Sequence, residues 1–82
     1  MKEEILRLIT VVREEAKKPG ASVLLPSIIK CLESMAESVN DPQERREWLA
    51  AGLGRIVMES PALTESTLGQ EIFRVLNKFA NW

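Results

Sequence analysis

Three proline-containing breaks, at residues 18–22, 40–42 and 60–64, divide this chain into four segments of helical length. Between the breaks, apolar residues recur at intervals of three and four, the spacing of one buried helix face, and no stretch alternates as a strand would. Proline lacks the backbone donor that a helix interior needs, so these breaks separate helices. The sequence therefore predicts one domain, residues 1–82, built as a compact all-α bundle of four helices at about 2–18, 22–39, 42–59 and 65–80, joined by short proline-containing loops.

The predicted helix starts differ in how sharply the residues define them. In the third helix, Asp41 has the chemistry of an N-cap, Pro42 suits the first helical position, and Glu44 stands where a capping box places its acidic partner. In the second helix, Ser22 is a candidate cap with Pro26 about one turn inside. The alternative is that the regular helix begins only at Pro26, because proline is tolerated in a first turn.

Composition narrows the classes of partner. The chain has 11 basic and 12 acidic residues, for a net charge of −1, so its surface has no overall attraction to nucleic acid or anionic lipid. No apolar run approaches the ~20 residues that span a bilayer. The start, Met1 to Glu4, leads directly into an amphipathic pattern without the apolar stretch of a signal peptide. We therefore expect a cytoplasmic protein with no membrane association.

The side chains that most often carry catalysis are missing. The chain has no histidine and no tyrosine, and Cys31 is its only cysteine. Without histidine there is no Ser-His-Asp or Cys-His arrangement, and one thiolate cannot form a metal cage. A small buried side chain is the favoured interpretation of Cys31, with a reactive thiol as the alternative. We expect no enzymatic activity, no cofactor and no metal site.

Two glycines, Gly52 and Gly54, lie inside the third predicted helix. Each costs about 1 kcal/mol relative to alanine in a helix interior. This pair predicts a place where another backbone approaches closely.

Several large apolar residues fall outside the main buried stripes. Trp48, Ala51 and Met58 lie along a second face of the third helix, with Arg55 among them. Tryptophan, methionine and arginine are enriched in protein interfaces. The sequence predicts a non-catalytic protein-interaction domain, regulatory or adaptor in role, that binds another protein or forms a homodimer through the third helix. The candidate interface residues are Trp48, Ala51, Arg55, Met58, Phe73 and Trp82.

The alternative function is nucleic-acid binding through the fourth helix. Residues 63–71, where Thr64 or Ser66 can cap that helix, resemble the turn and recognition helix of a helix-turn-helix. Glu65 and Glu71 on the same element oppose this interpretation, because phosphate contacts supply much of the affinity for DNA. The candidate contact residues for this alternative are Thr67, Gln70, Arg74 and Lys78.

Overall fold

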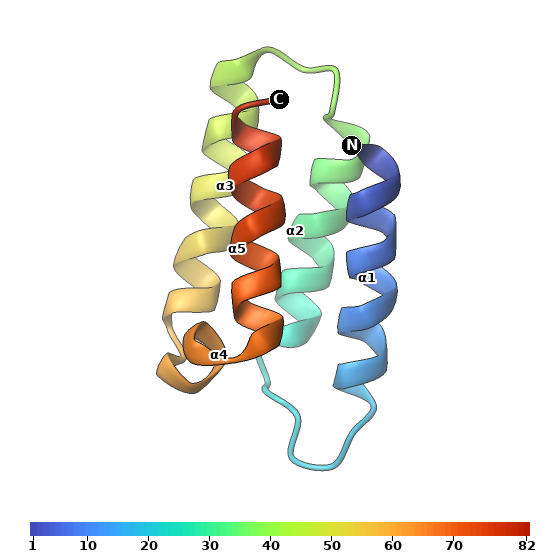
Figure 1. Cartoon of the computed structure of the whole chain (residues 1–82), viewed down its shortest axis with the longest axis vertical. Helices are drawn as coiled ribbons and strands as arrows, with labels where there is room; N and C mark the ends of the chain where they lie inside the picture. The colour runs from blue at the N-terminus through green and yellow to red at the C-terminus, as the bar shows by residue number, and fades with distance from the viewer.

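Five helices make up the computed structural model, which describes all 82 residues (Figure 1). Four of them are long, and the chain has no strand, so the predicted all-α bundle is confirmed. The fifth is a short helix in the third proline break. The helices are α1 (Lys2–Ala16), α2 (Leu25–Glu37), α3 (Gln43–Met58), α4 (Pro61–Glu65) and α5 (Thr67–Ala80).

The long helices run alternately up and down, so that the two ends of the chain lie at the same end of the bundle (Figure 1). Long helices that follow one another along the chain pack most extensively: α1 on α2, α2 on α3, and α3 on α5. Contacts between α1 and α5, which close the bundle, are sparser. None of the five helices combines the length and the hydropathy needed to cross a bilayer.

The core consists only of apolar side chains. Its 17 buried residues come from every helix, and no polar or charged side chain is buried. Phe79 is the largest of the fully buried side chains. The predicted stripes supply this core, because a helix with apolar residues every three or four positions presents them on one side.

The second helix begins late, as the Pro26 alternative anticipates. It starts at Leu25 and ends at Glu37, shorter than the predicted 22–39, and Pro26 lies in its first turn. Ser22 does not cap it: the Ser22 hydroxyl accepts a hydrogen bond from the Leu24 N–H, at 3.2 Å, in the turn before the helix. The preceding helix ends at Ala16, and Gly20 takes the positive φ of 77° that turns the chain.

The predicted capping box of the third helix is wrong. Pro42 is itself the flanking residue, with an extended ψ of 148°, and no side chain caps the helix. Asp41 therefore lies one residue too early to act as the cap. Its carbonyl instead accepts a hydrogen bond from the Arg46 guanidinium, which also donates to the Phe79 carbonyl at 3.2 Å. Arg46 thus joins the start of α3 to the end of α5.

The third break is folded, although the sequence predicts a loop there. The Ser60 hydroxyl accepts from the Leu63 N–H and caps α4. The Ser66 hydroxyl accepts from the Gly69 N–H at 2.9 Å, which confirms Ser66 rather than Thr64 as the cap of α5. Two serine caps six residues apart therefore permit a one-turn helix between two long ones.

Candidate functional site

Four of the six predicted interface residues form one strip along the outside of α3. Trp48, Ala51, Arg55 and Met58 follow one another at spacings of three and four, so they share one side of the helix. All four are exposed, and Trp48 and Met58 keep 65% and 66% of their surface accessible. We call these four residues the α3 strip.

A groove between α2 and α3 runs beside this strip. Its volume is about 300 Å³, and α2 contributes a short polar segment of its wall while α3 contributes most of the apolar surface. No acidic residue lines it. The lining residues are Lys30, Cys31, Ser34, Trp48, Leu49, Ala51, Gly52, Arg55 and Ile56, and we call this site the α2–α3 groove.

The cations of the groove have no acidic partner within the protein. Lys30 and Arg55 line the groove, and neither forms an ion pair. The Arg45 guanidinium lies 4.7 Å from the centre of the Trp48 ring, within range of a cation–π interaction. By contrast, Arg13 is held by a carboxylate from another helix, Glu33, at 2.9 Å. The lining of the groove therefore carries two cations and no carboxylate, while Glu47 and Glu44 lie on neighbouring hollows that Arg55 and Trp48 also line.

The two glycines of α3 have different surroundings. Gly54 is buried, and a Cβ there would lie 3.8 Å from the Phe73 ring, in ordinary contact. At Gly52 a Cβ would meet nothing within 4 Å, and Gly52 lines the groove. The predicted close approach of another backbone is therefore wrong at both positions. A side chain packs on Gly54, and the space above Gly52 is open.

The other two predicted interface residues lie apart from the α2–α3 groove. Phe73 is half-buried and lines another groove, of about 360 Å³, between α3 and α5, which Met58 also lines. Trp82 is exposed beyond the end of α5, with the Lys78 Nζ 6.0 Å from its ring centre. Trp82 lines neither groove.

The residues of the nucleic-acid alternative lie on the outside of α5, where Thr67 and Gln70 are exposed. Both cations there are engaged by carboxylates: Arg74 with Glu71 at 2.6 Å, and Lys78 with Glu4 at 2.5 Å. The hydrogen bond from Arg74 lowers the pKa of Glu71, and the one from Lys78 lowers the pKa of Glu4. These ion pairs reduce the positive charge that a phosphate backbone would meet.

Cys31 lines the α2–α3 groove and is half-buried. It is therefore less buried than the expected core side chain and less accessible than an exposed thiol. Burial raises the pKa of its thiol. Because the thiolate is the nucleophile, a raised pKa leaves the side chain protonated and weakly reactive at neutral pH.

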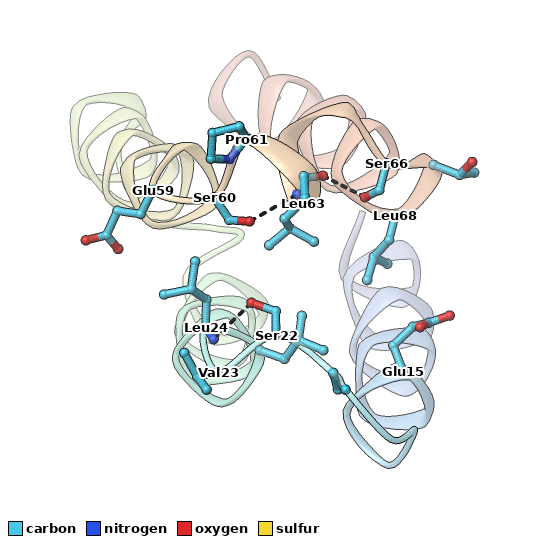
Figure 2. Close-up of a pocket in the computed structure, with 15 residues that line it drawn as sticks. Glu15, Ser22, Val23, Leu24, Glu59, Ser60, Pro61, Leu63, Ser66 and Leu68 are labelled. Atoms are coloured by element: carbon cyan, nitrogen blue, oxygen red, sulfur yellow. Dashed lines mark hydrogen bonds between the residues drawn. The ribbon is translucent and has the colours of Figure 1, made fainter.

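The largest hollow, about 920 Å³, lies at the end of the bundle between the α1–α2 loop and α4 (Figure 2). The Leu63 and Leu68 side chains point into it. Its serine hydroxyls serve local turns and caps. Ser22 accepts from the Leu24 N–H, Ser60 accepts from the Leu63 N–H, and Ser66 donates to the Leu63 carbonyl (Figure 2). Ser66 also accepts from the Gly69 N–H. The hollow is also lined by Glu15, which pairs with Lys18, and by Glu59 and Thr67, whose side chains form no hydrogen bond or ion pair within the protein.

No group of three or more acidic or cysteine side chains is arranged to hold a metal ion. Sequence reasoning found the α3 strip but missed the groove beside it, since Lys30 and Cys31 reach it from a different helix. No protein-family model, curated protein or solved structure matches the chain.

Proposed function

We propose that this protein is a small, non-catalytic interaction module, regulatory or adaptor in role, that binds another protein through the α3 strip and the α2–α3 groove. The observation that carries the proposal is the exposure of Trp48 and Met58 at the two ends of one strip, beside an apolar groove. Large side chains of these types are common at the energetic centres of interfaces.

These exposed side chains are not needed to complete the core. Seventeen apolar residues already form a continuous buried cluster, and Trp48 and Met58 are not part of it. The Arg45 guanidinium lies 4.7 Å from the centre of the Trp48 ring, so a partner would meet a tryptophan and an arginine together, two residue types enriched in interfaces.

Self-association through α3 is the second form of the same proposal, and one feature weighs against it. In a two-fold dimer each surface meets its own copy. Lys30 and Arg55 of the two copies would then be brought together without intervening carboxylates from the groove. Light scattering tests this form: a monomer unaffected by Trp48→Ala would exclude a dimer through the α3 strip.

Site-specific photo-crosslinking in the native host tests the proposed function. Replacing Met58 with p-benzoylphenylalanine should give a discrete protein adduct on illumination. Adding Arg55→Glu to the same chain should lower the yield of that adduct. The matched control carries the photoreactive group at Leu6, which is also exposed but lies on α1. No adduct at Met58, or an adduct that nuclease removes, would contradict binding of a protein here. The second result would support the nucleic-acid alternative.

A further inference from the structure

The α2–α3 groove combines an apolar floor with two cations that form no ion pair, and this combination restricts what can bind there. We infer that it receives an amphipathic helix of the partner protein whose apolar face is flanked by acidic side chains. This inference rests on the proposed function and specifies the partner's chemistry.

The spacing of the groove residues matches a helix. Trp48, Gly52 and Ile56 follow one another at intervals of four along α3. Eight residue steps separate the first from the last, or about 12 Å at the rise of an α-helix. Two turns of a partner helix cover about the same length and present apolar side chains at i, i+3, i+4 and i+7, the usual anchors of helix-in-groove binding.

The charge of the groove selects an acidic partner. Lys30 and Arg55 line it, no carboxylate does, and neither cation has an ion pair elsewhere in the protein. Acidic residues on either side of a partner's apolar face would meet these two cations at the rim. Such complementarity acts mainly on the association rate and on the choice of partner.

Gly52 supplies a second reason to place a side chain of the partner here. Glycine weakens a helix interior, and neither close packing nor a positive φ requires it at this position. What its missing side chain does provide is an open floor in the middle of the groove. A side chain from the partner helix can enter that space without displacing any group of this protein.

Two synthetic helical peptides test the inference. Both carry leucines at i, i+3, i+4 and i+7, and they differ only in having glutamates or lysines beside that face. In fluorescence-anisotropy titrations the glutamate peptide should bind on the order of tenfold more tightly than the lysine peptide, and added salt should narrow the difference. Backbone-amide NMR shifts should locate the bound peptide at the α2–α3 groove.

Three variants separate the groove from the rest of the surface. The double variant Lys30→Glu, Arg55→Glu should reverse the preference between the peptides. Arg7→Glu, a charge reversal on the exposed side of α1, should leave the preference in place. Gly52→Leu should weaken binding of the glutamate peptide on the order of tenfold by filling the floor, while the fold stays intact.

Equal affinity for the two peptides overturns the inference, as does a reversal that Arg7→Glu produces equally well. An oligonucleotide that displaces the peptide from the groove also overturns it. If the photo-adduct at Met58 forms but neither peptide is preferred, the proposed function stands and the acidic helix is wrong. If the adduct and the peptide complex both fail to form, both proposals are wrong.

Discussion

Replacing Gly69 with alanine should destabilise the fold, although alanine is normally the better helix residue. Gly69 lies in the first turn of α5, packed against the backbone of Leu63 and Thr64 in α4. A Cβ added there would stand 1.8 Å from the Leu63 carbonyl oxygen and 2.8 Å from its carbon. Both atoms belong to the backbone, so no rotamer change relieves the clash, and α4 itself must move.

The cost can be worked from what that movement breaks. The Leu63 carbonyl accepts hydrogen bonds from the Ser66 N–H, at 3.1 Å, and from the Ser66 hydroxyl, at 2.6 Å. Two such bonds contribute about 1–3 kcal/mol together, and the disturbed packing of Leu63 adds to the loss. With about 1–3 kcal/mol for that packing, and after subtracting the ~1 kcal/mol that alanine gains in a helix, we expect a net loss of about 1–5 kcal/mol. That is a large share of the ~4–12 kcal/mol typical for a chain of this length.

Urea unfolding followed by circular dichroism measures this difference, with Gly52→Ala as the matched control. At Gly52 the added methyl group meets open space, so the same substitution should raise the free energy of unfolding by up to about 1 kcal/mol. If Gly69→Ala is as stable as the parent protein, then α4 does not pack on α5 as described and the reasoning is refuted.

Four further substitutions or measurements follow from single features. Gly20→Ala should cost about 1–2 kcal/mol in urea unfolding, because φ is 77° there; an unchanged midpoint would contradict that conformation. Phe79→Ala should cost about 3–5 kcal/mol by the same assay, since the ring is fully buried; a loss under 1 kcal/mol, a rough lower bound for core truncation, would place it outside the core. The Lys78 hydrogen bond lowers the pKa of Glu4, so this contact stabilises the fold above the ordinary glutamate pKa and is lost as pH falls through the lowered value. In Glu4→Gln the free energy of unfolding should therefore change less with pH below the ordinary glutamate pKa. An unchanged pH dependence would show that the contact contributes no measurable stability. Finally, burial raises the pKa of Cys31, so iodoacetamide should label it more slowly at pH 7 than it labels free cysteine, and equal rates would mean an open thiol.

The long helices could be predicted because their information is local. The apolar period identifies the buried face of each helix, and prolines at the breaks separate one from the next. The prediction failed at Asp41, whose side chain has the right chemistry for a cap but whose position precedes an extended Pro42. It also missed α4, since five residues are too few to show a period. The signal for α4 was Ser60 directly before Pro61, a cap followed by a first-turn proline.

The candidate surface was predictable only in part, for a similar reason. The outward position of Trp48 and Met58 follows from their place on α3 alone, off the buried stripe. The groove depends instead on how α2 lies against α3, which brings Lys30 and Arg55 into the lining of one groove from distant parts of the sequence. No local pattern in the sequence encodes how the two helices pack, and none shows that the space above Gly52 is open.

The order in which the helices pack also bears on how fast the chain folds. Because each long helix packs mainly on the next one along the chain, most contacts join residues that are close in sequence. Such low contact order is typical of domains that fold within microseconds to milliseconds. The exception is the contact of α1 with α5, which joins opposite ends of the chain through sparse packing and the exposed pairs of Glu4. We expect these α1–α5 contacts to form last during folding and to break first during local opening. The backbone amide hydrogens of α1 should therefore exchange with solvent faster than those of α2 and α3.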